Sequence, residues 1–550
     1  MSRQQRLTLV ATILGSTIVF LDSTVVNVAL PEMEHALDTG LAGQQWIVEA
    51  YMLALVSLLL VGGAMGDQFG RRRMFVIGLA GFGVTSALCA VSTSTGMLIA
   101  ARALQGLAGA LLVPGSLAII AATFEGEARG KAVGTWTAWS GIATVVGPAG
   151  GGALVDGLSW NWIFWVNLPL IAFTLWLTRS AVPESRDPEA DLHIDYAGIG
   201  LSALGLGGPV FALIEQPTYG WGDPLVFIPL LAGVASFAAF VAHEVRTEHP
   251  MLDMSLFRVR NFAIANLTTL TAYAGLIGAF FFITLFLQQS LGYTALEAGF
   301  ATTPVSLLLF VLSPRFGRIT SGTGPRLPMT FGPIVGGIGL LMLTRLNVDS
   351  DYLTGVLPAI LVFGLGLSAT VAPLTATVLD SVEERHVGVA SGINNAVARV
   401  AGLLAIAVLG AVIAGQFGST LDNRLAGVRL SPAGQQAIEE VRSEALAGSQ
   451  GVNIPQAEED VIAPAIDDAS ESGFHLALLI AGVLMIVGGV VSGVGIRNPE
   501  RPPERIREPP RAAPAGECGR PHSADVEGLV PGALSPAPVG AGPGPPDPAL

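Results

Sequence analysis

Long apolar segments recur along almost the whole chain, and they restrict the possible folds more than any other feature. A helix needs about 20 apolar residues to cross the roughly 30 Å hydrocarbon layer of a membrane. Segments of this length follow one another from Leu7 to Ile496, most of them separated by short gaps. Charged residues make up only 13% of the sequence, against roughly a quarter in soluble globular proteins. The pattern excludes a soluble domain with a single anchor and predicts a polytopic membrane protein.

These segments are expected to be helices, because a backbone in lipid must satisfy its own hydrogen bonds and the sequence lacks the short alternating strands of a membrane barrel. The predicted fold class is therefore an all-α polytopic membrane protein with about fourteen spans. Their approximate bounds are 8–30, 46–66, 74–93, 97–121, 133–155, 162–180, 196–215, 224–243, 262–288, 295–314, 328–345, 353–378, 388–415 and 474–495.

The distribution of arginine predicts the orientation of the chain, because cytoplasmic loops are enriched in Lys and Arg. With Arg3 and Arg6 in the cytoplasm, every second loop up to Arg385 is also basic. Arg345 is an exception near an outside loop. The intervening loops without Lys or Arg are 31–45, 94–96, 156–161, 216–223 and 289–294. This alternation supports an even number of spans with both termini in the cytoplasm.

Two polar segments depart from the apolar pattern. Much of the formal net charge of −14 lies in segment 416–472, which we interpret as a solvated outside loop with a candidate short helix at 432–447; a lid or partner site is the alternative. Segment 497–550 is rich in Pro, Gly and Ala and is predicted to be a disordered cytoplasmic tail. The histidines lack metal-ligand spacing, so no metal site is expected.

An acidic residue interrupts the first apolar segment. Asp22 lies in the middle to outer part of span 8–30, where a carboxylate is costly enough to indicate a function. A carboxylate in such surroundings can bind and release a proton near neutral pH. The alternative is a structural role, in which Asp22 only pairs with a cation or caps a neighbouring backbone.

A cation lies in the fourth apolar segment, on a face shared with small residues. The positions that recur at helical spacing are Arg102, Gln105, Gly106, Gly109 and Ala110. Small residues beside a cation indicate close packing against another helix, with the charge directed inward. We hypothesise that Arg102 pairs with Asp22 in one conformation and releases it in another, which would couple a proton site to conformation.

Small residues also recur in the fifth apolar segment. Gly147 with Gly151 and Pro148 with Gly152 form small-xxx-small pairs that allow close helix contact, and Pro148 permits a bend.

The loop between the second and third segments contains Asp67, Gly70, Arg71 and Arg72. Asp67 can accept hydrogen bonds or pair with an arginine, and Gly70 can adopt a positive φ. A turn with positive-inside arginines would explain the arginines but not the whole arrangement.

These stretches, in this order, resemble the signature motifs of the major facilitator superfamily. Residues 63–72 resemble its loop motif G-x-L-G/A-D-R-x-G-R-R, and 102–106 resemble its helix 4 motif R-x-x-Q-G. Residues 147–152 resemble the helix 5 motif associated with antiporters. Residues 21–31 and 160–169 are similar to signatures of the fourteen-helix drug:proton antiporter branch. The departures from these motifs are Met65, Gln68 and Asn161.

The resemblance covers nearly all of residues 1–495 and weakens in the second half, where 388–399 is similar to the entry into helix 13 of that branch. It implies two six-helix bundles around a central cavity, with two helices inserted between them and alternating access by rocking. The implied domains are an N-terminal bundle at 1–190, the inserted helices and a linker at 191–260, and a C-terminal bundle at 261–496.

The resemblance also implies roles for individual residues. The helix 1 aspartate and helix 4 arginine of this family are linked to proton coupling, which implies that role for Asp22 and Arg102. The loop motif at 67–72 is expected to latch the two bundles in one state.

Glu49 and Gln105 are candidates for a substrate or proton site. Glu49 lies near the outer end of the second span, where a carboxylate that reaches the membrane surface is the favoured interpretation and a second proton or cation-substrate site is the alternative. Glu215 is interpreted as a surface carboxylate in the same way.

The motif series predicts a proton-coupled antiporter that exports small, lipophilic or cationic drugs or antibiotics across a bacterial plasma membrane. A proton-coupled symporter that imports a nutrient and a non-transporting membrane sensor are the alternatives; no enzymatic constellation is present. No cofactor is expected, because the proton-motive force would drive export, and one proton crossing about 100 mV releases about 2.3 kcal/mol. The expected partners are a small-molecule substrate, protons and membrane lipid, without nucleic acid, and the protein is expected to be a monomer.

Overall fold

The structure is a computed structural model that describes residues 1–186, 195–247, 250–347, 350–383, 387–443, 446, 449 and 452–498. Within these ranges the chain is built from helices and contains no strand. The segment predicted as a disordered tail lies outside the described residues, apart from Arg497 and Asn498.

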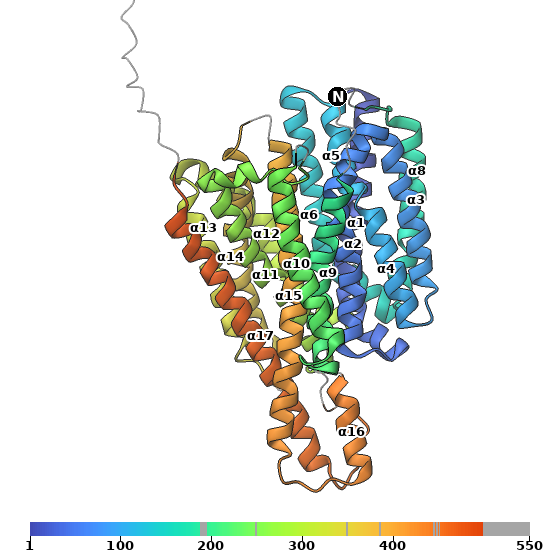
Figure 1. Ribbon diagram of the computed structural model, residues 1–550, viewed down its shortest axis with the longest axis vertical. Coiled ribbons are helices and arrows are strands. Elements are labelled where there is room, and N and C mark those ends of the chain that lie inside the picture. Colours follow the sequence, from blue (N-terminus) through green and yellow to red (C-terminus); the bar gives the residue numbers. More distant parts are fainter. Residues whose placement is uncertain are drawn as a thin grey trace, which may run out of the picture. The chain divides into compact units, whose positions relative to one another are not determined.

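Long helices run back and forth along one axis (Figure 1). In the described part of the chain, twelve helices are long and apolar enough to cross a membrane, and the bent helix α2 raises the number to thirteen. Helix α6, with 32 residues, is also of spanning length. The prediction of about fourteen spans in an all-helical membrane protein therefore agrees with the structure.

We refer to α1–α8 as the N-terminal half and to α11–α17 as the C-terminal half. The helices of the first half are α1 (Arg3–Leu37), α2 (Gly40–Phe69), α3 (Arg71–Ala90), α4 (Thr95–Gly109), α5 (Leu112–Thr123), α6 (Gly126–Gly157), α7 (Trp162–Trp165) and α8 (Asn167–Ala181). The helices between the halves are α9 (Tyr196–Tyr219) and α10 (Pro224–Arg246). The helices of the second half are α11 (Arg260–Gln289), α12 (Ala295–Thr323), α13 (Arg326–Leu343), α14 (Leu357–Asp380), α15 (Val387–Arg424), α16 (Pro432–Ser443) and α17 (Glu459–Gly495).

Two predicted spans are broken, and the last two extend into the polar segment between them. The fourth span divides into α4 and α5, and the sixth divides into α7 and α8. The last two spans continue into segment 416–472, because α15 ends at Arg424 and α17 begins at Glu459.

Segment 416–472 is more ordered than the solvated loop expected for it. Helix α16 confirms the short helix expected at 432–447, and the ends of α15 and α17 lie beside it, projecting beyond the other helices (Figure 1). Phe417, Leu421 and Val441 are each at most 1% exposed. Glu439 and Glu440 lie on α16, and Asp467 and Asp468 lie on α17. Both helices also bury apolar side chains, so net charge is a poor guide to order in this segment.

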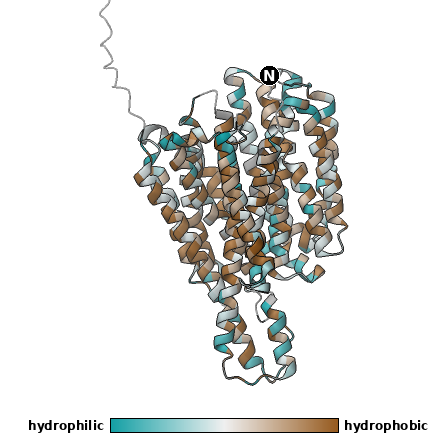
Figure 2. Ribbon diagram, in the orientation of Figure 1, coloured by the Kyte–Doolittle hydropathy of each residue, from teal (hydrophilic) through white to brown (hydrophobic). Residues whose placement is uncertain are grey.

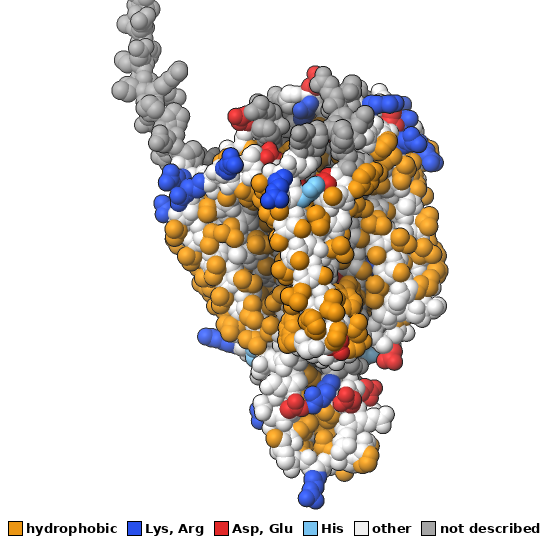
Figure 3. Space-filling model, in the orientation of Figure 1, with side chains coloured by type: hydrophobic (Ala, Val, Ile, Leu, Met, Phe, Trp, Pro, Cys, Tyr) orange, Lys and Arg blue, Asp and Glu red, His pale blue; other side chains and the backbone are white. Residues whose placement is uncertain are grey.

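The two ends of the helix bundle differ in composition. Hydrophobic residues cover its flanks (Figure 2), while Lys and Arg gather mostly at the end that holds the N-terminus (Figure 3). We call this the N-terminal end and the opposite one the α16 end. Since α1 runs away from the N-terminal end and successive spans alternate, α17 returns the chain to it, where Arg260 Nε donates to the Gly495 carbonyl at 2.8 Å.

The inserted helices form a hairpin that touches both halves. Gly208 and Gly233 allow α9 and α10 to pack closely: a Cβ atom on Gly208 would lie 2.3 Å from the Pro229 carbonyl oxygen. Helix α9 contacts α2 of the N-terminal half and α15 of the C-terminal half, whereas α10 packs chiefly on α9. Most of the α10 surface is exposed, as expected for a helix that faces lipid.

Candidate functional site

The predicted pairing of Asp22 with Arg102 is present in the core of the N-terminal half. Arg102 Nη1 donates to Asp22 Oδ2 at 2.5 Å, and the two residues are at most 2% exposed. Gln105 Nε2 donates to the other carboxylate oxygen of Asp22 at 3.0 Å. Both ions are thus removed from water, and the attraction between them and the added hydrogen bonds must offset the cost of desolvation.

The guanidinium of Arg102 is held from several sides. Its Nη1 also donates to Gln105 Oε1 at 2.6 Å, and its Nε donates to the Ile47 carbonyl at 3.1 Å. The Tyr51 ring lies 4.2 Å from the guanidinium carbon, a distance suited to a cation–π contact. The amide of Gln105 therefore bridges the ion pair, accepting from the arginine and donating to the carboxylate.

Small residues bring α4 close enough to α2 to form this network. A Cβ atom on Gly106 would lie 2.2 Å from the Tyr51 carbonyl oxygen, so a larger residue would force the helices apart. The face predicted from helical spacing is the buried face, since Arg102, Gln105 and Gly106 are all buried. This confirms the prediction that the charge is directed inward beside a close helix contact.

Asn167 is a member of the network that the sequence analysis missed. Its Nδ2 lies 3.2 Å from Asp22 Oδ1 and 3.1 Å from Ser86 Oγ. The signal was available, because Asn167 belongs to the motif at 160–169, but nothing in the sequence related α8 to α1. Asp22 thus accepts hydrogen bonds from three side chains on two other helices.

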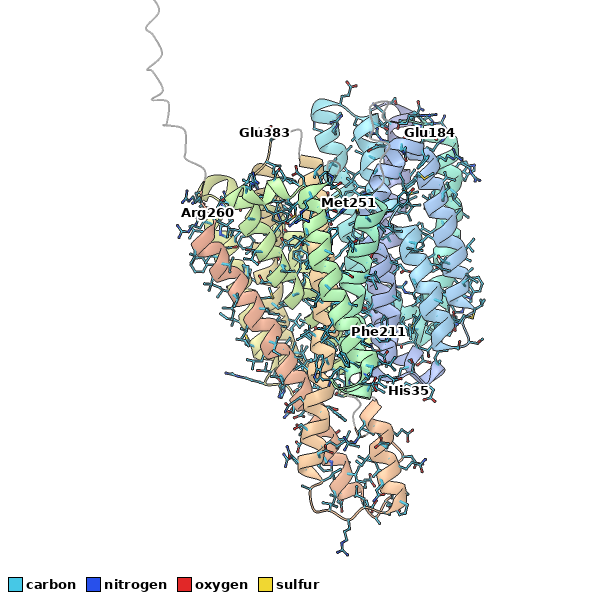
Figure 4. The ribbon with its side chains drawn as sticks, in the orientation of Figure 1. His35, Glu184, Phe211, Met251, Arg260 and Glu383 are labelled. Atoms are coloured by element: carbon cyan, nitrogen blue, oxygen red, sulfur yellow. The ribbon has the colours of Figure 1, made fainter. Side chains whose placement is uncertain are left out.

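The hydrogen-bond partners of Arg71 and Arg72 lie within the loop motif and in the segment that follows α8. Arg71 Nε lies 2.7 Å from Asp67 Oδ1, and the Arg72 backbone N–H donates to Glu184 Oε1 at 3.0 Å. Gly70 has φ 108°, as its position in the motif predicted. Glu184, labelled in Figure 4, lies at the N-terminal end. In this conformation the motif therefore braces α2 and α3 against the segment that follows α8.

The two small-xxx-small pairs of α6 face different helices. A Cβ atom on Gly147 would lie 2.1 Å from Thr24 Oγ1, and one on Gly151 would lie 2.7 Å from Val25 Cγ1. Both of these contacts are with α1, in the same half.

The second pair faces the other half. A Cβ atom on Gly152 would lie 2.5 Å from the Ala295 carbonyl oxygen, and one on Gly299 would lie 2.4 Å from the Pro148 carbonyl oxygen. Helix α6 therefore packs closely on α1 with one face and on α12 with the next, which confirms the prediction of close helix contact.

Hydrogen bonds between described residues of the two halves all lie towards the α16 end. Gln45 Nε2 donates to the Ile406 carbonyl at 2.7 Å, and Gln288 Nε2 donates to the Val28 carbonyl at 3.1 Å. Glu34 of α1 also accepts from Gln289 of α11.

Asp156 adds a further link between the halves at this end. Its carboxylate accepts from the backbone N–H groups of Ala295 at 3.2 Å and Leu296 at 2.9 Å. These groups open helix α12, so a negative charge from one half lies at the positive helix terminus of the other. The α16 end is thus the joined end of the two halves.

The interpretation of Glu49 as a surface carboxylate is wrong. Its side chain is 0% exposed, and among the described residues neither carboxylate oxygen has a hydrogen-bond partner. The error has a physical cause, since α9 and α15 cover this part of α2 and no sequence pattern revealed that contact. Glu215, interpreted in the same way, is partly buried and accepts from Trp46 Nε1 at 2.8 Å.

Arg399 is a second ionisable residue that sequence reasoning left without a role. It lies within α15 and is partly buried. In the described part of the chain it has no hydrogen bond or ion pair. Among those residues, no group of three or more His, Cys, Asp or Glu side chains could hold a metal ion.

The chain is similar to curated proteins named for drug resistance. It is 34% identical to the multidrug resistance protein Stp of Mycobacterium tuberculosis over 493 residues, which cover 88% of this chain and 91% of that protein. It is 31% identical to the tetracenomycin C resistance and export protein of Streptomyces glaucescens, covering 93% of this chain and 95% of that protein. It is 37% identical to a puromycin resistance protein of Streptomyces alboniger, covering 74% and 81% respectively.

Solved structures share the fold at low sequence identity. The chain matches a bacterial homologue of the human lysosomal transporter Spinster with a TM-score of 0.63 and 15% identity, covering 90% of this chain and 97% of that one. The family model described as Major Facilitator Superfamily matches residues 12–406. The fold, the motifs and these similarities together establish that this multi-pass membrane protein belongs to the major facilitator superfamily.

Proposed function

We propose that the protein is a proton-coupled antiporter that exports small, lipophilic or cationic drugs or antibiotics by alternating access. The observation that carries the proposal is the buried ion pair of Asp22 and Arg102, which places an ionisable carboxylate at the centre of a helical network. An intramembrane charge of this kind is retained for function, because a structural contact could be made at lower cost by apolar side chains. The names of the similar proteins, which refer to resistance and export, support the same direction of transport.

The proposed topology places the N-terminal end in the cytoplasm of a bacterial cell, with the protein a monomer in the plasma membrane. The gathering of Lys and Arg at this end supports that orientation. The α16 end then faces outward, and the structure corresponds to a state in which the outer ends of the two halves are joined. The functional units would be the bundles at 1–190 and 261–496, with 191–260 inserted between them.

Export would proceed by separating the outer ends of the two halves and joining their cytoplasmic ends. Breaking the contacts of Gln45, Gln288 and Asp156 would open the outer end, and the loop motif at 67–72 would then join the cytoplasmic ends of the halves. The pairs on α6 suit this motion, because Gly147 and Gly151 stay against α1 while the Gly152 face separates from α12.

The proposal is tested by efflux of a lipophilic cationic dye from energised cells, comparing the wild type with Asp22→Asn at matched expression. Protonophore-sensitive efflux that is lost in Asp22→Asn is the expected result. Unchanged efflux in the variant would remove Asp22 from proton coupling. Efflux from the wild type that ignores the protonophore would instead contradict proton-driven transport.

A further inference from the structure

Glu49 lies where helices from three parts of the chain meet. One turn before it, Gln45 of α2 donates to Ile406 of α15. One turn after it, Leu53 of α2 packs on α9, where a Cβ atom on Gly207 would lie 3.2 Å from the Leu53 side chain. Helices α9 and α15 also contact each other. These positions place Glu49 at the junction of α2, α9 and α15, and its side chain is out of contact with solvent.

The surroundings of Glu49 favour an uncharged carboxyl group. Moving an ionised carboxylate out of water costs several kcal/mol or more unless a cation or hydrogen-bond donors compensate. Among the described residues, both of its oxygens lack partners, and no ion pair involves it. The helices packed around this part of α2 carry several ionisable side chains. They include Asp22 and Glu34 of α1, Arg102 of α4, Glu215 of α9, Arg399 of α15, and Glu439, Glu440 and Arg442 of α16, beside Tyr51 of α2 itself.

Those groups differ from Glu49 in that the carboxylates among them have partners. Glu34 accepts from Gln44 and Gln289, and Glu215 accepts from Trp46. Asp22, in the core of the same half, accepts from three side chains. A proton on Glu49 would remove a buried charge that no described donor compensates.

We propose that Glu49 is a second proton carrier of the transport cycle, alongside the Asp22 site, an inference that rests on the proposed antiport. When the α16 end is open, the Glu49 carboxylate is hydrated and takes a proton from hydronium on that side, forming one O–H bond. Closing the junction removes the water, which favours the neutral carboxyl. When the same O–H bond breaks and water on the N-terminal side accepts the proton, the bare carboxylate favours reopening of the α16 end, and the cargo leaves.

The test measures which end is open as a function of pH, and it needs no identified cargo. Spin labels are placed on His35→Cys, labelled in Figure 4, and Val461→Cys, two exposed positions at the α16 end of opposite halves. In the purified full chain, the wild-type distance should lengthen as pH rises and Glu49 loses its proton. Glu49→Gln, which is neutral and nearly isosteric, should keep the short distance at every pH.

Glu215→Gln is the matched control, because it removes a carboxylate from the same junction; its distance should change with pH as in the wild type. The proposal is overturned if Glu49→Gln titrates like the wild type, or if the wild-type distance ignores pH. A pH response that depends on Glu49 in a protein without protonophore-sensitive efflux would support the proton site and contradict the export function. Failure of the Glu49 proposal can therefore be distinguished from failure of the proposed export function.

Labelling of the wild-type chain gives a measurement that does not depend on a variant folding. A hydrophobic carbodiimide reacts with protonated carboxyl groups in apolar surroundings, and mass spectrometry locates the modified residue. Glu49 should be modified at low pH and progressively protected as pH rises, while Glu215 should stay unmodified. Absence of modification at Glu49 at low pH would contradict the proposal.

Discussion

At the scale of single residues, the membrane-embedded charges divide into satisfied and unsatisfied groups. Asp22 and Arg102 complete each other and are further bonded by Gln105 and Asn167. Glu49 and Arg399 have no hydrogen bond or ion pair among the described residues. Removing one member of a satisfied pair leaves its partner buried without a counter-ion and should lower stability. Removing an unsatisfied charge removes a desolvation cost and should raise stability.

Loss of one member of the satisfied pair should be strongly destabilising. Arg102→Leu leaves the Asp22 carboxylate buried without its counter-ion, and we expect a loss of about 3–5 kcal/mol in the free energy of unfolding. The double variant Asp22→Asn with Arg102→Leu should recover part of that loss, because no charge remains. Thermal unfolding in detergent measures both. A double variant less stable than Arg102→Leu would show that the pair is not the cause.

Loss of Arg399 should have the opposite effect on stability. Arg399→Leu removes a partly buried cation that has no partner, so the melting temperature should rise, while transport should fall if the residue is retained for function at the expense of stability. The two measurements are thermal unfolding and dye efflux on the same preparation of cells and protein. A lower melting temperature would contradict this prediction and would show that the Arg399 side chain stabilises the fold.

At the scale of helices, α6 serves two contacts with two adjacent faces. Its small residues meet α1 within one half and α12 in the other, and each face leaves no room for a Cβ atom. In the proposed mechanism, the contact with α1 persists through the transport cycle, whereas the contact with α12 is made only when the α16 end is joined. Identical substitutions on the two faces should therefore affect different properties.

Gly151→Ala should lower stability and Gly152→Ala should change conformation. A methyl group at Gly151 meets Val25 inside one half, which should cost about 1–3 kcal/mol by overpacking. A methyl group at Gly152 meets the Ala295 carbonyl across the halves, so the α16 end should open and the spin-label distance should lengthen. Gly157→Ala is the control, since a Cβ atom there has nothing within 4 Å. Equal effects of the two substitutions would contradict the assignment of a stability role to Gly151 and a conformational role to Gly152.

Helix periodicity and motif spacing predicted more of the helices than of their contacts. The spans, the inward face of α4 and the positive φ of Gly70 all follow from local patterns. The burial of Glu49 does not, because it depends on α9 lying beside α2 although about 150 residues separate them in sequence. Asn167 was missed for the same reason, since its partner is on a helix distant in sequence.

At the scale of the whole molecule, few bonds hold the joined end. The described hydrogen bonds between halves are made by Gln45, Gln288, Glu34 with Gln289, and Asp156. Each is an ordinary interaction, so the balance between the two conformations should be sensitive to any one of them.

Asp156→Ala should shift this balance measurably. The substitution removes a negative charge from the start of α12, which should weaken the joined state by about 1 kcal/mol, or about fivefold in the equilibrium. The spin-label distance distribution at fixed pH measures the shift. Asp223→Ala is the matched control, because Asp223 caps α10 at the same end without joining the halves. A distribution unchanged by Asp156→Ala would show that this carboxylate does not hold the end closed.

The position of α9 bears on how such a chain could have evolved. In an ancestor without α9 and α10, α15 alone would cover the Glu49 position on α2, and the carboxylate would lose part of its shield from lipid, where it is selected against. The acid therefore depends on the inserted hairpin: either the hairpin came first and made the acid tolerable, or both arose together. Lineages that lose the hairpin should also lose the acid, whereas lineages that keep the hairpin are free to replace the acid.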